Sequence, residues 1–126
     1  MIVIYFDGSS KNGQGAWAFV VTQGANVLYV GRGIGKATSN EAEYNAAIEA
    51  VQFGNAGWPS ERKLLRGDSK LVIEQAQGRF KIRAKNLKPL AEKFKAELSK
   101  GEWCLEWIPR EHNGLADAEA SSLIGG

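Results

Sequence analysis

The sequence predicts an α/β domain built on a five-stranded mixed sheet flanked by helices, and three observations lead to this fold class. The first 35 residues hold three strand-like segments separated by turns, a pattern typical of an antiparallel meander. After residue 38, segments with helical periodicity alternate with two short apolar strands, a pattern typical of parallel strands joined by helical crossovers. The length of 126 residues suits one domain, and no internal repeat or long linker divides it. We therefore expect a single domain over residues 1–126.

The predicted meander begins with residues 1–6, an almost continuous apolar run that is typical of a buried strand. Residues 8–15 are rich in Gly, Ser and Asn, so they are interpreted as a loop. Residues 16–22 and 27–35 are rich in β-branched and aromatic residues and predict two further strands, joined by a turn at residues 23–26.

The next segment is a helix predicted to open near Thr38 or Asn40 and to run to Phe53. Its apolar stripe recurs at helical spacing, at Tyr44, Ala47, Ile48 and Val51. Residues 54–59 are interpreted as a connector, and residues 63–67 predict the fourth strand.

The chain after residue 68 is predicted to contain three helices and one strand. A helix over about residues 69–77 follows the fourth strand at once. A second helix is indicated by apolar residues at helical spacing, namely Leu87, Leu90, Ala91, Phe94 and Leu98. Pro89 lies in its first turn and Gly101 is placed to end it. Residues 103–108 predict strand five, and a last helix covers about residues 114–123. In the order β-β-β-α-β-α-α-β-α, strands one, four and five should be parallel, with right-handed crossovers.

Charge is distributed unevenly along the chain, although the net charge is only +2. Residues 62–100 carry 12 basic and 4 acidic residues, a net charge of +8, whereas the remainder has a net charge of −6. This polarity predicts a face that binds polyanions beside an acidic centre that binds cations. A solvated helix surface explains the charges of residues 93–100 better. A second group of basic residues clusters around the loop between the helix at residues 69–77 and the helix that contains Pro89. For this group we favour contact with phosphates: Arg79, Lys81, Arg83, Lys85 and Lys88.

The setting of the protein is also constrained by the sequence. Cys104 is the single cysteine, so no internal disulfide can form, and its apolar neighbours predict a small core residue. The chain has no apolar run of about 18 residues and no charged-then-apolar leader, so we expect neither a membrane span nor a secretion signal. A cytoplasmic setting fits these observations. The sequence leaves the oligomeric state open, and a monomer is the default expectation.

Two aspartates directly follow predicted strands. Asp7 ends the run at residues 2–6, and Asp68 ends residues 63–67. In open α/β sheets, sites form beyond the carboxyl ends of strands, so these carboxylates would lie close together if strands one and four are neighbours. Their repulsion would then require positive charge between them. Two alternatives stay open: Asp7 begins a common Asp-Gly turn pair, and Asp68 is also placed to cap the following helix.

Two further carboxylates lie in predicted helices. Glu43 precedes three alanines on its own helix face, which places it over a close-packed groove: Ala46, Ala47 and Ala50. Glu41 differs, because residues 38–41 fit a capping box that gives Glu41 a structural role. A box formed by Asn40 and Glu43 is the alternative, and it stays open. Asp117 lies in the first turn of the last helix, where an acid also stabilises the helix dipole.

A carboxylate away from water costs several kcal/mol unless a cation or a donor compensates it. Four carboxylates that converge make a site for hard divalent cations, and two Mg²⁺ ions are the natural occupants. We therefore predict as metal ligands and catalytic residues Asp7, Glu43, Asp68 and Asp117.

Four short motifs occur in order along nearly the whole chain. They are Asp7-Gly8-Ser9, the helix opening at residues 38–44, Gly67-Asp68-Ser69, and residues 109–113 followed by Ala116-Asp117-Ala118. Together they resemble ribonuclease H of type 1. Any one motif is weak, but four in register make chance agreement improbable.

The resemblance implies an RNase H-like fold and endonucleolytic hydrolysis of the RNA strand of an RNA–DNA hybrid, leaving 5′-phosphate and 3′-hydroxyl ends. It implies that the four carboxylates hold two Mg²⁺ or Mn²⁺ ions. It also implies contacts with the RNA strand from Gly8, Ser10, Asn12, Ser39 and Asn40. A phosphate of the DNA strand would be held by Lys36 and Thr38. Purely structural roles for the two asparagines, as turn former and helix cap, stay open.

The chain departs from the family pattern in two places. Many bacterial relatives carry a basic insertion between the central helices, but here only residues 78–85 stand in its place, so hybrid binding would depend on a few cations such as Arg79 and Lys81. Relatives also often place a histidine on a longer loop ahead of the last aspartate. Here His112 is only five residues before Asp117, so its role stays open between a catalytic residue and a helix-entry residue.

Two other functions are consistent with the same sequence. One is a module that binds hybrids with weak or no cleavage, and the other is a metal-dependent nuclease with broader substrates that include double-stranded RNA. Four acidic residues at the expected ligand positions argue against the first. A comparison of cleavage of a hybrid, an RNA duplex and a DNA duplex distinguishes the second from a hybrid-specific ribonuclease.

Overall fold

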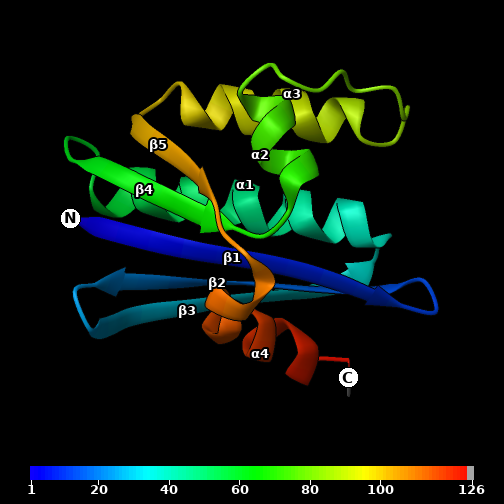
Figure 1. Ribbon diagram of the computed structural model, residues 1–126, viewed down its shortest axis with the longest axis horizontal. Coiled ribbons are helices and arrows are strands. Elements are labelled where there is room, and N and C mark those ends of the chain that lie inside the picture. Colours follow the sequence, from blue (N-terminus) through cyan, green and yellow to red (C-terminus); the bar gives the residue numbers. More distant parts are fainter. Residues whose placement is uncertain (125–126) are drawn as a thin grey trace.

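The computed structural model describes residues 1–124 and contains the predicted five-stranded mixed sheet (Figure 1). The strands are β1 (Ile2–Lys11), β2 (Gln14–Gln23), β3 (Asn26–Lys36), β4 (Arg62–Gly67) and β5 (Glu102–Trp107). Across the sheet they lie in the order β3-β2-β1-β4-β5. β2 pairs antiparallel with both β1 and β3, whereas β4 pairs parallel with both β1 and β5. The predicted fold class and the predicted strand directions are confirmed.

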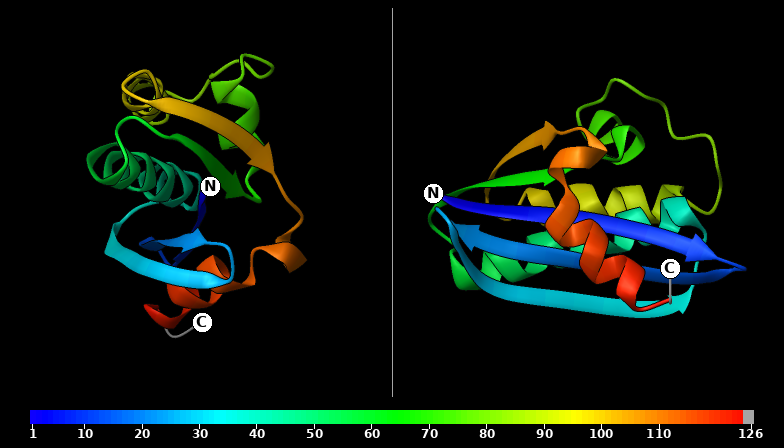
Figure 2. Two further views of the ribbon diagram at one scale, coloured as in Figure 1. Left: turned by 90° about the vertical axis from the view of Figure 1, so that its left-hand side faces the viewer. Right: turned by 60° about the horizontal axis from the view of Figure 1, so that its bottom comes forward.

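Helices cover both faces of this sheet (Figures 1 and 2). They are α1 (Ser39–Gly57), α2 (Lys70–Ala76), α3 (Lys88–Leu98) and α4 (Gly114–Ser122), with a short 3₁₀ turn, η1 (Arg110–His112), ahead of α4. α1 packs against β1 and β2 with α2 and α3 beside it, and α4 packs against the same two strands from the opposite face. In the part of the chain that is described, no helix combines the length and apolarity needed to span a bilayer.

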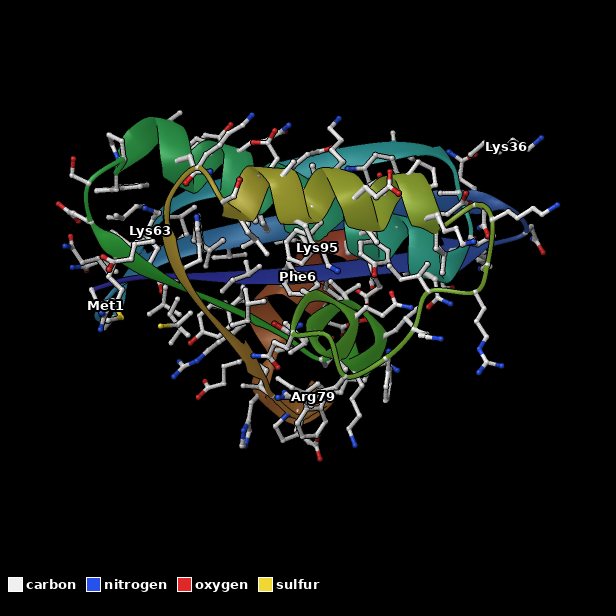
Figure 3. The ribbon with its side chains drawn as sticks, turned by 90° about the horizontal axis from the view of Figure 1, so that it is seen from above. Met1, Phe6, Lys36, Lys63, Arg79 and Lys95 are labelled. Carbon is white, nitrogen blue, oxygen red and sulfur yellow. The ribbon has the colours of Figure 1, made fainter. Side chains whose placement is uncertain are left out.

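The main core lies between α1 and the sheet. Alternate residues of β1 are fully buried there, Phe6 near the centre of the molecule (Figure 3). Three buried alanines let α1 approach the sheet closely, Ala46, Ala47 and Ala50. The approach is closest at Gly8, where an added Cβ would lie 2.3 Å from the backbone of Ala42. A glycine at this position is therefore what allows α1 to lie directly on β1.

The predicted loop at residues 8–15 is wrong. β1 continues to Lys11, residues 8–11 pair with β2, and the turn consists only of Asn12 and Gly13. These two residues have φ angles of 54° and 80°, the left-handed conformation that a two-residue hairpin favours. Gly and Ser suggested a loop, but pairing with β2 and coverage by α1 outweigh their weak strand propensity.

Two smaller predictions are also wrong. α1 continues to Gly57 instead of ending at Phe53, because Gly54 is buried beneath the ring of Trp103 and keeps the helix in the core. Cys104 is exposed and is not a core residue. It lies on the edge strand β5 between Trp103 and Leu105, which both turn toward the core, so the residue between them faces away.

Candidate functional site: an acidic pocket at the end of β4

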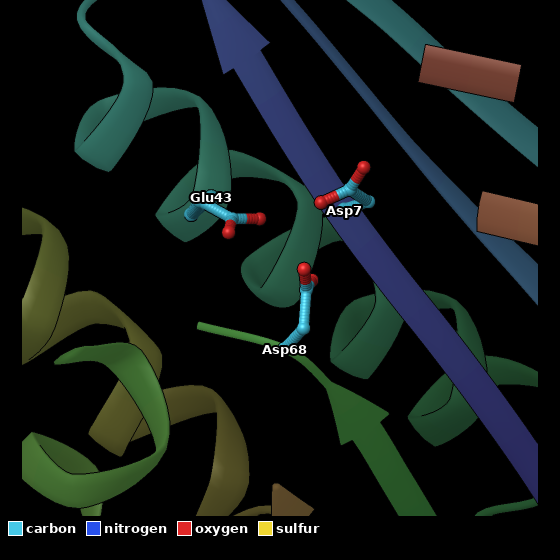
Figure 4. A group of neighbouring side chains, drawn as sticks. All are labelled: Asp7, Glu43 and Asp68. Atoms are coloured by element: carbon cyan, nitrogen blue, oxygen red, sulfur yellow. The ribbon is translucent and has the colours of Figure 1, made fainter. Parts of the chain in front are cut away.

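Three carboxylates meet where β1 and β4 diverge (Figure 4). β1 pairs with β4 only as far as Phe6, which lies opposite Gly67, so Asp7 and Asp68 follow the last paired residues of neighbouring strands. Glu43 reaches the same point from α1. One carboxylate oxygen from each of the three side chains lies within 4.8 Å of the others. Strands β1 and β4 are therefore neighbours, which was the condition for Asp7 and Asp68 to lie close together.

Glu43 is directed into the pocket by its contact with β1. The backbone N–H of Gly8 donates a hydrogen bond to Glu43 Oε1 at 2.6 Å. The capping box uses Glu41 instead: its backbone N–H donates to Thr38 Oγ1 at 3.2 Å, and its carboxylate accepts from the N–H of Thr38 at 2.8 Å. The alternative in which Glu43 closes a box with Asn40 is therefore excluded.

Asp68 is also free of a capping role. Ser69 caps α2, since its Oγ accepts the N–H of Val72 at 3.3 Å. Asp68 Oδ1 accepts a hydrogen bond from Asn113 Nδ2 at 3.0 Å, and the backbone carbonyl of Asp68 accepts one from the indole of Trp107 at 3.1 Å. Asp68 is therefore held from both its side chain and its backbone.

Asp117 lines the same pocket, a hollow of about 230 Å³, from the first turn of α4. It is not one of the three carboxylates within 4.8 Å of one another. Its Oδ1 lies 3.7 Å from the guanidinium of Arg110, which lines the pocket as well. Arg110 was not predicted as a site residue, because a single arginine in a connecting segment forms no recognisable pattern.

The crowding of acidic groups changes their proton affinity. Burial, then the charges of Asp68 and Asp117, raise the pKa of Asp7 to about 8. Burial, then the charges of Asp7 and Asp68, raise the pKa of Glu43 well above its usual range, and the hydrogen bond from Gly8 offsets only part of this. A divalent cation would relieve the repulsion, and an all-carboxylate ligand set suits the hard ions Mg²⁺ and Mn²⁺. The pocket therefore fits the predicted ions.

His112 lies away from the acidic pocket. Its exposed side chain borders a second hollow of about 230 Å³, together with Tyr5 and Leu115. Its backbone N–H donates to the carbonyl of Pro109 at 2.9 Å within η1. His112 is not among the described residues that line the acidic pocket.

Three of the five residues expected to contact RNA line the acidic pocket. Gly8, Ser10 and Ser39 line it, and Ser10 Oγ also donates to the backbone that links β3 to α1, at 2.7 Å. Asn12 lies in the exposed β1–β2 turn, and Asn40 is exposed in the first turn of α1. Their contacts with nucleic acid stay a prediction.

The basic residues are more dispersed than the sequence suggested. Lys36, at the end of β3, and Arg79, beyond α2, lie far apart in Figure 3. Arg79 pairs with Glu74, and Lys63 is buried with its ammonium group donating to backbone carbonyls. Lys81 is exposed in the segment between α2 and α3. Part of the positive charge of residues 62–100 is therefore already bound to other groups of the protein.

Comparison with known proteins identifies the family. Residues 5–123 match the family described as reverse transcriptase-like. Ribonuclease HI from Halobacterium salinarum is 35% identical over 126 residues, which cover 95% of this chain and 62% of that protein. The bifunctional protein Rv2228c of Mycobacterium tuberculosis is 34% identical over 133 residues, covering 98% of this chain and 35% of that protein. The chain thus spans less than two thirds of the length of these curated relatives.

Solved structures agree with the sequence comparison. The crystal structure of RNase H1 from Halobacterium salinarum aligns with a TM-score of 0.89 at 30% identity, covering 99% of this chain and 98% of that one. The chain belongs to the ribonuclease H type 1 family. A second member of the family, LC11-RNase H1 in complex with an RNA/DNA hybrid, aligns with a TM-score of 0.88 at 27% identity over 97% of this chain and 95% of that one. The resemblance carried by the four sequence motifs is confirmed.

Proposed function

We propose that this chain is an endoribonuclease that hydrolyses the RNA strand of RNA–DNA hybrids. The observation that carries the proposal is the pocket lined by four carboxylates in a chain of the ribonuclease H type 1 family. The hybrid bound to LC11-RNase H1 supports the choice of ligand. A protein that only bound hybrids would gain nothing from placing four negative groups against a phosphodiester.

The four carboxylates would hold two Mg²⁺ or Mn²⁺ ions. When bound, such ions supply an activated water and stabilise the charge that develops on the scissile phosphate and the leaving 3′-oxygen, which gives 5′-phosphate and 3′-hydroxyl ends. Asp7 interacts with the charges of Glu43, Asp68 and Asp117, so it is the ligand best placed to be shared. One chain supplies all four groups, so the proposal requires no second copy.

The hydrogen bonds around the pocket prepare these ligands for binding. The Gly8 N–H holds one oxygen of Glu43, and the Asn113 amide holds one oxygen of Asp68. A carboxylate oxygen that accepts one hydrogen bond keeps further lone pairs for an ion. These two hydrogen bonds would therefore orient Glu43 and Asp68 before substrate arrives.

The RNA strand would be recognised around the mouth of the pocket. A hybrid exposes the 2′-hydroxyls of its RNA strand in a wide minor groove. The polar groups available to contact them are those of Gly8, Ser10, Asn12, Ser39 and Asn40. Because Gly8 contributes its backbone, a substitution there would affect substrate binding and metal binding together.

The DNA strand and the flanking phosphates would be held by positive groups. Thr38 caps α1, and the free N–H groups at the start of this 19-residue helix favour an anion close to Lys36. Arg79 and Lys81 are further candidates for phosphate contacts. Arg79 would have to exchange its pairing with Glu74 for a phosphate, so we expect the smaller contribution from it.

The direct test is cleavage of three matched duplexes: an RNA–DNA hybrid, an RNA duplex and a DNA duplex of one sequence, each strand labelled in turn. The proposal predicts cleavage of only the RNA strand of the hybrid in Mg²⁺ or Mn²⁺ and no cleavage in EDTA. Binding of the hybrid without cleavage in either metal would favour the binding module instead. Equal cleavage of the RNA duplex would favour the broader nuclease.

A further inference from the structure

Asn113 lies where the elements that carry the carboxylates meet. It directly precedes α4 and is only 1% exposed. Its Nδ2 donates two hydrogen bonds, to the carbonyl of Phe6 at 2.9 Å and to Asp68 Oδ1 at 3.0 Å. Phe6 immediately precedes Asp7 and is the last residue of β1 that pairs with β4. One amide group therefore bridges the two strands at the point where they diverge.

The backbone of Asn113 extends this connection to the fourth carboxylate. Its carbonyl accepts the N–H of Asp117 at 3.0 Å, and its own N–H donates to the carbonyl of Arg110 at 3.0 Å. A single residue thus contacts Asp68 directly, Asp7 through its chain neighbour, and Asp117 through the first turn of α4.

The orientation of the Asn113 amide is fixed by its surroundings. The Phe6 carbonyl and the Asp68 carboxylate are both acceptors, so only the NH₂ end of the side chain can face them. The Oδ1 atom is consequently left buried, and within residues 1–124 it has no hydrogen-bond partner. A buried acceptor without a partner destabilises a fold, so this asparagine is a poor choice for stability alone.

We propose that Asn113 is a positioning residue that sets the Asp68 carboxylate relative to Asp7 so that both can bind the same divalent ions. Without its amide, the Asp68 side chain would rotate away from the negative charge of Asp7 and the two ligands would lose their common orientation. Partners that orient metal ligands through hydrogen bonds typically change metal affinity by about 10–100-fold. The inference rests on the proposed metal-dependent function.

The test measures metal binding without nucleic acid, by following the electron paramagnetic resonance signal of free Mn²⁺. Asn113→Ala should weaken Mn²⁺ binding by about 10–100-fold, and the milder Asn113→Ser should do so by a smaller factor. In hybrid cleavage at fixed Mn²⁺, kcat should fall while KM for the hybrid stays within twofold, because Asn113 is buried beneath the pocket.

Asn55 provides a matched control at the other end of the sheet. Its side chain also forms two hydrogen bonds, donating to the carbonyl of Glu97 at 2.8 Å and accepting from the indole of Trp103 at 2.9 Å. Asn55→Ala should lower the melting temperature yet leave Mn²⁺ affinity within twofold of the parent.

The outcomes separate the inference from the proposed function. If the parent protein binds no Mn²⁺, the proposed function fails and the inference fails with it. If the parent binds Mn²⁺ and both Asn113 variants bind it within twofold as tightly, only the inference fails. Equal losses in Asn55→Ala, or unfolding of both Asn113 variants at 10 °C, would show a merely structural role and overturn the inference.

Discussion

Replacing Asp7 by asparagine should stabilise the protein when no divalent metal is present. Asp7 is 6% exposed, and burial followed by the charges of Asp68 and Asp117 raises its pKa from 3.8 to about 8. The folded protein therefore binds this proton more tightly than the unfolded chain does. The raised pKa costs the folded state no stability below about pH 3.8. Between that pH and about pH 8 the loss in the free energy of unfolding grows with pH, and above pH 8 the loss is constant. Asparagine removes the charge and with it this pH-dependent cost.

The size of the effect follows from the pKa difference. Almost four pKa units at pH 7.5 correspond to at most about 5 kcal/mol. Rearrangement of the pocket and binding of monovalent cations reduce this, so we expect a gain of about 1–3 kcal/mol, or a rise in Tm of about 3–12 °C. Near pH 4 the difference should approach zero. Saturating Mg²⁺ should stabilise the parent more than the variant, because the variant lacks one ligand charge.

Thermal unfolding followed by circular dichroism in EDTA, at several pH values between 4 and 9, measures this difference. Glu111→Gln is a suitable control, since Glu111 is exposed in η1 and its substitution should leave Tm unchanged at every pH. A variant less stable than the parent at pH 7.5, or a gain of the same size at pH 4, would refute the argument that burial and neighbouring charges oppose the ionisation of Asp7 in the folded protein.

Three further predictions follow from the pocket and its supports. Gly8→Ala should destabilise the fold by about 1–3 kcal/mol and abolish cleavage, because the added Cβ would displace α1. Gly57→Ala is the control and should do neither, because the space around Gly57 is open. Urea unfolding and cleavage assays check both variants. His112→Ala should retain cleavage within about threefold, since the side chain lies outside the pocket, and a loss as complete as that of Asp68→Asn would contradict this. Thr38→Ala should cost about 1 kcal/mol of stability by loss of the cap and should weaken hybrid binding measured by fluorescence anisotropy; unchanged binding would remove Thr38 from the phosphate site.

Local patterns predicted most of the fold. The apolar run that begins β1 and the apolar stripe of α1 are visible over a few residues, so both elements could be found without knowledge of their partners. The errors occurred where a partner decides the structure. Residues 8–11 have the composition of a loop, but β2 and α1 hold them in a strand, and Cys104 lies in an apolar segment but on the outer side of an edge strand.

The candidate site was predictable in its charges but not in its supports. Carboxylates at the ends of buried strands are unusual enough to be noticed, which is why Asp7 and Asp68 could be selected. Glu43 could be selected because three alanines share its helix face. Asn113 and Arg110 offer no such signal, because a single polar residue in a connecting segment is ordinary. Only the folded structure shows that Arg110 lines the pocket and that Asn113 lies beneath it, in contact with β1.

The proposed function requires that the four carboxylates bind a pair of divalent ions beside a nucleic-acid backbone. Anomalous scattering from a crystal of the unsubstituted protein, grown with Mn²⁺ and a non-cleavable RNA–DNA hybrid, would test this directly. We predict two Mn²⁺ peaks, about 2.0–2.3 Å from carboxylate oxygens of Asp7, Glu43, Asp68 and Asp117 and next to one phosphate of the RNA strand. A hybrid bound in the crystal with no Mn²⁺ between it and these side chains would contradict the claim.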